Sequence, residues 1–163
     1  MRIPLTQGRY AIVDEEDYAE ISKHKWYLSR GGTGRTYAAR TYRENGNRET
    51  VKMHNQIMKP PPGLYVDHKS GDSLDNRRAN LRICTHAENQ HNQRTWTKKK
   101  SSEFKGVYWN RQLKRWIARI NLNGNRKHLG CFHSEDAAAQ AYDLAATTLF
   151  GEFARTNFKK GSG

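Results

Sequence analysis

The sequence predicts an α+β protein made of two small units, in which short antiparallel strands pack with a few helices. Short runs of strand-forming residues are separated by turns such as Asn-Gly, a pattern that predicts β-hairpins. One long Ala-rich segment near the C-terminus has the composition of a helix that packs closely on a sheet. The 163 residues fit one or two small domains. A domain of roughly 60 residues buries only about 60% of its unfolded surface, so each unit is marginal by itself.

The first part of the chain is predicted to hold a strand and turn, a helix, a hairpin and a short helical segment, at residues 3–13, 14–25, 37–53 and 54–58 in that order. Acidic residues occupy the first turn of the helix, where the helix dipole is positive. Asn45-Gly46 supplies the positive φ angles that the hairpin turn requires. Three prolines at 60–62 end the helical segment.

The middle of the chain is predicted to form two strands and a helix, at residues 63–68, 81–84 and 85–93, joined by a turn-rich loop at 69–80. Residues 81–84 alternate, which places Leu81 and Ile83 on one face. Thr85 and Glu88 have the spacing of a capping box, which starts the following helix.

The second half of the chain is predicted to form three strands and a helix, at residues 104–109, 115–122, 126–132 and 134–150. The Asn-Gly-Asn sequence at 123–125 indicates a hairpin turn, and Ser134 is a good N-cap. We therefore expect domains at residues 1–94 and 104–160. The basic stretch 95–103 between them is either a solvated connector or a segment that lies along phosphates.

Charge and composition point to a polyanionic partner. The net charge is +13, and between residues 91 and 132 eleven Lys and Arg residues stand against Glu103 alone. Such asymmetry favours nucleic acid over a merely solvated basic surface. The only two cysteines, Cys84 and Cys131, lie far apart, so we expect packing residues in a reducing compartment and no disulfide framework. We also expect no membrane segment. Aromatic side chains are expected to fill much of the core, namely Trp26, Tyr37, Tyr42, Trp109, Trp116, Tyr142 and Phe150.

The segment at residues 66–93 carries the chemistry. Asp67 and His68 end a short apolar run, and Asn80 and Asn89 follow in the same segment. His68 is the natural general base, because free imidazole has a pKa near 6.5. Asp67 and the amide of Asn89 offer hard oxygen ligands of the kind that Mg²⁺ prefers. Neighbours on a strand point to opposite faces, so Asp67 and His68 flank one phosphate only if the strand ends there.

Each of these residues also has a structural alternative. His68 could be an ordinary histidine at a strand end, and Asn89 a solvated helix residue. Asn76 and Asn80 could both be turn formers, and we favour that interpretation for Asn76, whereas Asn80 is expected to tie the loop to the backbone near His68. His54 is expected to pack behind the site.

This segment resembles the HNH endonuclease family of the homing type. The match covers His68, Asn80 and Asn89, and extends to Asp67, Asp75-Asn76-Arg77-Arg78 and Asn80-Leu81-Arg82. The resemblance implies a ββα-metal nuclease domain in which His68, Asn80 and Asn89 are catalytic. It also implies that Asp67 and Asn89 bind one divalent ion, Mg²⁺ or alternatively Mn²⁺. Asn89 stands where the family often has a final His, a variant that occurs within the family.

Residues 104–158 resemble the plant APETALA-type, or ethylene-response-factor, DNA-binding domain. The resemblance rests on Lys105-Gly106-Val107-Tyr108, on Arg115 to Ile120, on His128-Leu129-Gly130, on Ala141-Tyr142-Asp143 and on Asn157-Phe158. It implies a three-stranded antiparallel sheet that lies in the DNA major groove, with one helix behind it. Alternation places Trp116, Ala118 and Ile120 toward the helix, and Ile117 outward with the basic residues. The DNA-binding set implied by the match is Lys105, Tyr108, Arg115, Arg119, Arg126 and His128.

Together these features predict a metal-dependent DNA endonuclease, of the nicking or homing type found in phage and mobile elements. We expect a monomer that binds double-stranded DNA in the cytoplasm of a bacterial or phage-infected cell, with a dimer as the alternative. The rival prediction is a non-catalytic, sequence-specific DNA-binding regulator that uses the C-terminal sheet. RNA remains an alternative substrate.

Overall fold

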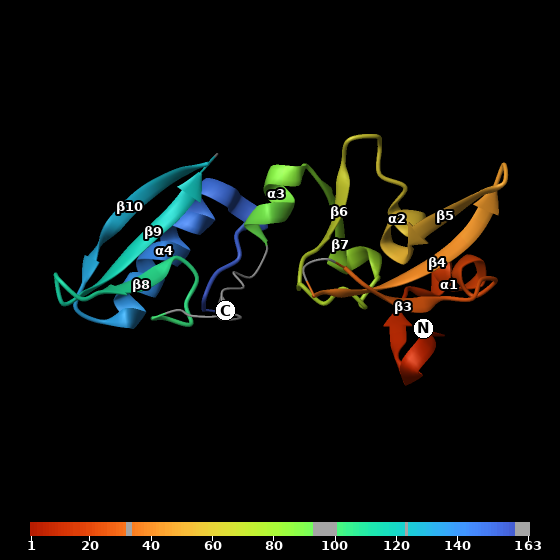
Figure 1. Ribbon diagram of the computed structural model, residues 1–163, viewed down its shortest axis with the longest axis horizontal. Helices are drawn as coiled ribbons and strands as arrows, with labels where there is room; N and C mark the ends of the chain where they lie inside the picture. The colour runs from red at the N-terminus through yellow and green to blue at the C-terminus, as the bar shows by residue number, and fades with distance from the viewer. Residues whose placement is uncertain (32–33, 93–100, 123, 159–163) are drawn as a thin grey trace. The chain divides into compact units, whose positions relative to one another are not determined.

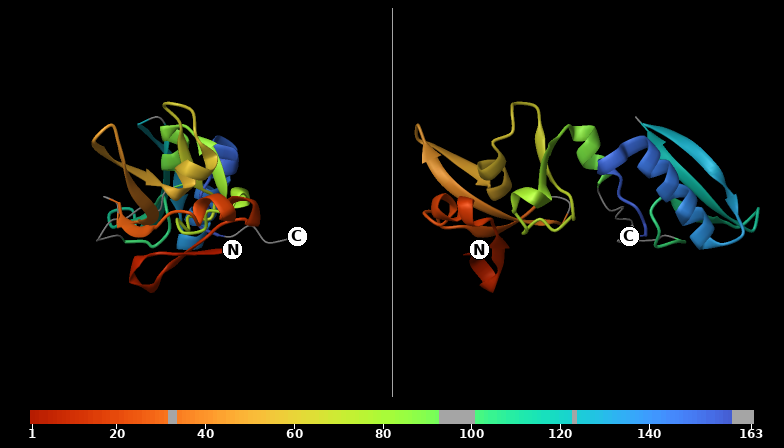
Figure 2. Two further views of the ribbon diagram at one scale, coloured as in Figure 1. Left: turned by 90° about the vertical axis from the view of Figure 1, so that its right-hand side faces the viewer. Right: turned by 180° about the vertical axis from the view of Figure 1, so that it is seen from behind.

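The computed structural model describes residues 1–31, 34–92, 101–122 and 124–158, and the chain divides into two compact units, Met1–Asn89 and Gln90–Gly163. Figure 1 shows the elements of each unit and Figure 2 shows them from two further directions. Most of the predicted basic linker lies outside the described residues. Among the described helices, none is long and apolar enough to cross a bilayer.

The first unit opens with a small hairpin of β1 (Arg2–Pro4) and β2 (Tyr10–Ile12), joined through the 3-10 turn η1 (Thr6–Gly8). Helix α1 (Glu15–Ile21) follows, with acidic residues in its first turn as predicted. The helix is shorter than the predicted 14–25. Trp26 accounts for the early end, because its indole Nε1 donates to the carbonyl of Ile21 at 2.8 Å and directs the chain into the core.

A three-stranded antiparallel sheet comes next, in the order β3 (Tyr27–Arg30), β4 (Thr36–Glu44) and β5 (Asn47–Lys52). The predicted hairpin is confirmed, with φ of 50° at Asn45 and 80° at Gly46 in its turn. Strand β3 was not predicted. Helix α2 (Met53–Met58) then ends at Lys59 in a left-handed conformation, directly before the prolines.

The third part of the unit is the pair β6 (Tyr65–His68) and β7 (Leu81–Cys84), with the 3-10 turn η2 (Arg78–Asn80) before β7 and helix α3 (His86–His91) after it. The capping box is confirmed, because Glu88 accepts from the backbone N–H of Thr85 at 2.8 Å. The expected apolar face of β7 is wrong at Ile83, which is 37% exposed, while Arg82 is buried. Arg82 lies directly opposite Asp67 in the register, so it follows the carboxylate inward.

The core of the first unit joins all of these parts. Ile3, Val13, Ile21, Trp26 and Met53 belong to one buried cluster, to which β4, β6 and β7 also contribute. The prediction that Tyr42 fills the core is wrong, since 37% of this residue is exposed. Its ring instead supports the guanidinium of Arg40, which lies 5.0 Å from the ring centroid.

The loop at residues 69–80 is fastened to the N-terminal elements. The backbone N–H of Asn76 donates to the carbonyl of Ile12 at 2.7 Å, and the N–H of Ile12 donates to the carbonyl of Leu74 at 2.8 Å. Arg78 donates through its guanidinium to Asp17 at 2.7 Å, and its backbone N–H donates to Asp14 at 2.7 Å. Asp17 of α1 and its N-cap residue Asp14 therefore hold the loop that follows β6.

The second unit is a three-stranded antiparallel sheet packed on one helix, as predicted. Its strands are β8 (Val107–Asn110), β9 (Arg115–Leu122) and β10 (Asn125–Phe132), with β9 in the centre. Helix α4 (Glu135–Phe150) begins at Ser134, whose hydroxyl accepts from the N–H of Ala137 at 3.1 Å, and the turn η3 (Gly151–Phe153) follows it.

Small side chains allow α4 to lie close to this sheet. Ala118 and Ile120 pack against the helix through Ala138 and Tyr142, as the alternation predicts. Gly106 has a φ of +79°, and a Cβ there would lie 2.0 Å from the Tyr142 ring, so only glycine fits.

The burial of Ile117 and the exposure of Cys131 in the second unit differ from expectation. Ile117 points to the outer face but is only 2% exposed, because it lies between Tyr108 and Cys131 on the neighbouring strands. Cys84 is buried as expected, but Cys131 is exposed. The Asn157 side chain bonds both backbone groups of Lys105, and Asp143 accepts the N–H of Asn157. These bonds give Asp143 and Asn157 a structural role.

Candidate active site

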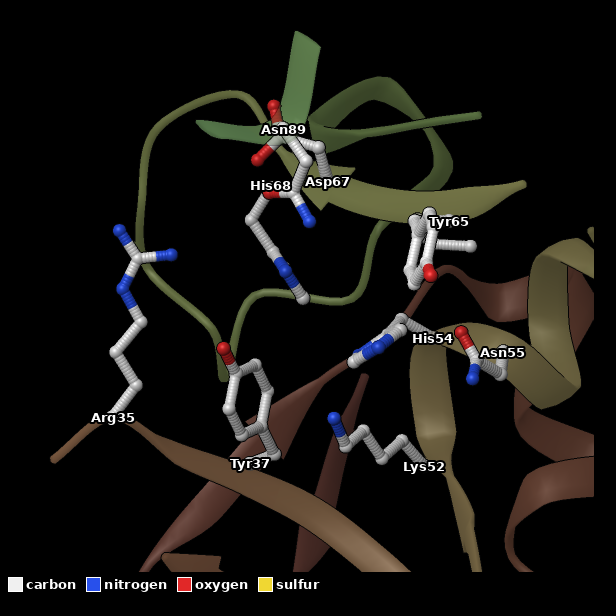
Figure 3. Close-up of a pocket in the computed structure, with 10 residues that line it drawn as sticks. Arg35, Tyr37, Lys52, His54, Asn55, Tyr65, Asp67, His68 and Asn89 are labelled. Carbon is white, nitrogen blue, oxygen red and sulfur yellow. The ribbon is translucent and has the colours of Figure 1, made fainter. Parts of the chain in front are cut away.

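Strand β6 carries the predicted site residues to one pocket. Asp67, His68 and Asn89 all line it (Figure 3). The strand ends at His68, and the chain turns at once, with the N–H of Gly71 donating to the His68 carbonyl at 2.9 Å. This turn meets the condition under which two adjacent residues can serve one site.

Asp67 is held by a buried ion pair. Its Oδ2 accepts from Nε of Arg82 at 3.0 Å and from the terminal guanidinium nitrogen Nη2 at 2.7 Å. The two side chains are 2% and 9% exposed, respectively. Because Asp67 and Arg82 are direct cross-strand partners, the register of β6 and β7 fixes the carboxylate at the pocket.

Asn76 positions the imidazole of His68. Its Oδ1 lies 3.4 Å from Nε2 of His68, and its Nδ2 donates to the carbonyl of Leu74 at 3.1 Å. Asn76 has no exposed surface, so the prediction of a plain turn former is wrong for this residue. No local signal distinguishes it, because its burial depends on the long-range backbone bond to Ile12.

The surroundings of His68 favour its neutral form. Burial lowers the pKa of His68 below its ordinary value of 6.5, and this effect outweighs the opposing hydrogen bond to Asn76 and the charge of Asp67. The ring is therefore unprotonated at neutral pH and can accept a proton.

Asn80 lies outside the pocket lining and fastens the loop. Its Oδ1 accepts from the N–H of Ser70 at 2.9 Å, and its Nδ2 donates to the carbonyl of Asp75 at 2.7 Å. The backbone carbonyl of Asn80 accepts from the N–H of Lys69 at 2.8 Å. Asn80 thus joins the two ends of the loop directly after His68.

His54 packs against the ring of His68. The two centroids are 4.9 Å apart with an interplanar angle of 89°, and Tyr37 contacts His54 from another side at 5.6 Å. Burial lowers the pKa of His54 to about 3, and the charges of His68 and Lys52 act in the same direction. His54 therefore stays neutral in the folded protein.

This burial predicts an acid-sensitive fold. In the unfolded chain His54 binds a proton as the pH falls below its ordinary pKa of 6.5. In the folded protein its pKa is about 3, so it stays unprotonated until the pH approaches that value. Stability is therefore lost as the pH falls from 6.5 toward 3. We expect His54→Phe, which keeps an aromatic ring beside His68, to reduce the slope of unfolding free energy against pH by up to about 1.4 kcal/mol per pH unit. Urea denaturation at a series of pH values measures this slope, and a variant that keeps the wild-type slope contradicts the assignment.

Residues outside the predicted motif complete the pocket. Arg35 directly precedes β4, Tyr37 lies on β4 and Lys52 ends β5. The Nζ of Lys52 lies 4.6 Å from the centroid of the Tyr37 ring. In Figure 3 the ammonium group of Lys52 points into the space between Tyr37 and His54. The sequence pattern did not indicate these residues, because only the register of a separate hairpin brings them to β6.

The second unit gathers most of the predicted DNA-binding residues on one sheet face. Arg119 lies opposite His128, and Arg126 lies opposite Asn121, so these side chains share the face that points away from α4. The guanidinium of Arg119 lies 4.5 Å from the centroid of the Tyr108 ring on the same face. Arg115 also points to this face, whereas Lys105 precedes β8 and lies outside the strands.

Comparisons with known proteins find one relative that spans most of the chain and others that match only part of it. A family model described as HNH endonuclease matches residues 59–91. An uncharacterized HNH endonuclease, L560 of Acanthamoeba polyphaga mimivirus, is 33% identical over 153 residues, covering 93% of this chain and 76% of the relative. Protein 3.8 of Escherichia phage T7 is 31% identical over 97 residues, covering 58% of this chain and 77% of the relative.

The C-terminal part is also similar to plant transcription factors. The AP2-like ethylene-responsive transcription factor PLT2 of Arabidopsis thaliana is 44% identical over 61 residues, which cover 36% of this chain. The match spans only 11% of that relative, so the likeness is confined to one domain-sized segment.

Proposed function

This chain belongs to the HNH endonuclease family, and we propose from this premise that it is a metal-dependent endonuclease that hydrolyses a phosphodiester bond of duplex DNA. One observation carries the proposal: Asp67, His68 and Asn89 line a single pocket. A carboxylate, an imidazole and an amide gathered there offer one general base and two oxygen ligands, which are the groups that this hydrolysis needs.

His68 is the proposed general base. Because Nε2 faces the amide oxygen of Asn76, the neutral ring carries its proton on Nε2 and offers the lone pair of Nδ1 to a proton from water. The lowered pKa of His68 keeps that lone pair available at neutral pH. Asn80 acts through the loop that it fastens, so we assign it a positioning role.

Asp67 and Asn89 are proposed to hold a divalent ion, Mg²⁺ or alternatively Mn²⁺. The donor set fits, because carboxylate and amide oxygens are hard ligands. Arg82 donates to one carboxylate oxygen of Asp67, Oδ2, and this ion pair orients the group at the pocket. Such an ion, when bound, would neutralise phosphate charge and stabilise the leaving oxygen.

We assign cutting to residues 1–94 and holding of the duplex to residues 104–160, joined by the segment 95–103. The likeness to plant transcription factors supports DNA as the partner of the outer face of β8, β9 and β10. The proposed contact residues are Lys105, Tyr108, Arg115, Arg119, Arg126 and His128. Phosphate contact is the default for the arginines, since such contacts position a protein on DNA without reading its sequence.

Nicking is the proposed outcome of one engagement. The Asp-His pair occurs once in the sequence, so a monomer cuts one strand, and a double-strand break needs a dimer or two successive events. The viral and phage relatives support a role as a homing or mobile-element nuclease.

The rival is a DNA-binding regulator without catalysis, which the similarity of the second unit to transcription factors favours. Incubation of the full chain with supercoiled plasmid, with and without Mg²⁺ or Mn²⁺, separates the two. Conversion to the open-circular form only when a divalent ion is present is the expected result. Binding without any ion-dependent nicking supports the regulator, and cleavage of RNA in place of DNA would show that the substrate is wrong.

A further inference from the structure

The sheet of β3, β4 and β5 has two chemically different faces, and we propose that one of them binds the phosphodiester backbone of the DNA that enters the pocket. The inference rests on the proposed function, because it takes duplex DNA as the substrate. This surface belongs to the first unit, and its residues lie outside the matched segment 59–91.

The register of the hairpin decides which side chains share a face. Residues directly opposite one another in an antiparallel pair point to the same side, and successive residues alternate. Lys52 lies opposite Ala39, next to Tyr37 on the same side of β4. The pairs Thr41–Thr50 and Arg43–Arg48 continue along that side toward the turn. We call this side the basic face; its residues are Tyr37, Thr41, Arg43, Arg48, Thr50 and Lys52.

Side-chain contacts agree with this assignment. The ammonium nitrogen of Lys52 lies 4.6 Å from the centroid of the Tyr37 ring. The hydroxyl oxygens of Thr41 and Thr50 lie 3.5 Å apart, and the hydroxyl of Tyr27 on β3 reaches Thr41 at 3.1 Å. Cations and hydroxyl groups therefore run in a continuous row from the pocket toward the hairpin turn.

The acidic residues of the hairpin lie on the side opposite the basic face. Within the described strands β3, β4 and β5, both acids, Glu44 and Glu49, occupy positions that point away from the basic face. Arg43, Arg48 and Lys52 are exposed, and none of the ion pairs among the described residues involves them. The basic face thus offers three cations and no carboxylate.

In the protein without DNA, repulsion between Arg43 and Arg48 destabilises the hairpin. Like charges directly opposite one another on neighbouring strands are destabilising. The acids Glu44 and Glu49 lie next to these arginines in the sequence but point to the other side, so they do not offset the repulsion across the pair. A polyanion bound to this face would remove the repulsion, which is the property that favours a phosphate backbone over an uncharged partner.

The basic face continues directly from the pocket. Lys52 and Tyr37 belong to the face and also line the pocket beside His68 (Figure 3). From Lys52 to Arg48 the strand β5 advances about 13 Å at roughly 3.3 Å per residue. That length spans about four phosphates of one strand along a duplex axis. The same DNA strand can therefore place one phosphate at His68 and its neighbours on the hairpin.

The test compares two double variants of the full chain. Arg43→Gln with Arg48→Gln removes the outer cations of the basic face. Arg2→Gln with Arg9→Gln removes two exposed arginines from the hairpin of β1 and β2, so the net charge changes equally. Affinity for a short DNA duplex is measured in EDTA over a range of salt concentrations. Each lost phosphate contact reduces the slope of log K against log salt by about 0.9. We expect the first variant to lose about 1.8 in slope, and the second to keep the wild-type slope.

Equal losses in both variants would reduce the effect to net charge and overturn the proposal, as would an unchanged slope in the first variant. Thermal melting without DNA provides a check on folding. Relief of the Arg43–Arg48 repulsion should leave the melting temperature of the first variant equal to that of wild type or higher, and a clear decrease contradicts the argument.

Nicking of plasmid by the same wild-type preparation tests the proposed function separately. If the wild-type protein nicks plasmid but the first variant keeps the wild-type salt slope, the proposal for the basic face is wrong and the proposed nuclease function stands. If the wild-type protein does not nick plasmid but only the first variant loses salt slope, DNA binding by the basic face is supported and the proposed nuclease function is wrong.

Discussion

His68→Ala is expected to lower the rate of DNA nicking by roughly 10²–10⁴-fold, the usual contribution of a positioned general base. The reason is the arrangement around the ring: Asn76 faces Nε2, and burial keeps the imidazole neutral and able to accept a proton. The change removes no positive charge at neutral pH, so the affinity for DNA should stay nearly constant. Single-turnover nicking at saturating protein, with binding measured in EDTA, separates the two quantities.

A matched change at another histidine controls this experiment. His24 lies after α1, 3.9 Å from Glu20, and does not line the pocket. We expect His24→Ala to nick plasmid at the wild-type rate. Equal nicking by His68→Ala and wild type would remove His68 from catalysis, and a large loss of DNA affinity in His68→Ala would show that it acts in binding instead.

Arg82→Met is expected to destabilise the first unit by about 3–5 kcal/mol, because it removes the guanidinium that pairs with the buried carboxylate of Asp67. A domain of this size is stable by only about 5–15 kcal/mol, so the variant would be close to unfolding. Denaturation by urea measures the loss when it is followed by tryptophan fluorescence, to which the buried Trp26 contributes for this unit.

A neighbouring arginine supplies the control for burial. Arg77 also donates two hydrogen bonds to a carboxylate, from Nε to Oδ1 of Asp75 at 2.8 Å and from Nη2 to Oδ2 at 2.7 Å. Its side chain, however, is 52% exposed. Exposed pairs contribute at most about 1 kcal/mol, so Arg77→Met should cost little. The double variant Asp67→Asn with Arg82→Met should recover much of the loss, since no unpaired charge stays buried. Equal losses in Arg82→Met and Arg77→Met would contradict the role given to burial.

The sequence was most informative where structure depends on neighbouring residues. Asn45-Gly46 marks a hairpin, and Thr85 with Glu88 marks the start of α3, because each signal acts within a few residues. Strand β3 escaped prediction since Tyr27–Arg30 has no clear alternation and becomes a strand only by pairing with β4. The outer position of Ile117 was deduced correctly from alternation, but its burial depends on side chains of β8 and β10.

The same limit applies to the candidate site. Asp67, His68 and Asn89 are found from the spacing of one continuous segment, and all three line the pocket. Asn76 was misjudged because a backbone bond to Ile12, far away in the sequence, buries it beside His68. Lys52 was missed because the register of a different hairpin places it there. Contacts between segments that are distant in the sequence cannot be predicted from the local pattern of one sequence.

The bonds from the loop at 69–80 to Ile12, Asp14 and Asp17 bear on protein engineering. A fusion enzyme assembled from the matched segment 59–91 alone would lack the groups that seat Asn76 and Arg78. A module made for transplantation should therefore begin at β1, because the N-terminal residues hold the loop that places Asn76 beside His68.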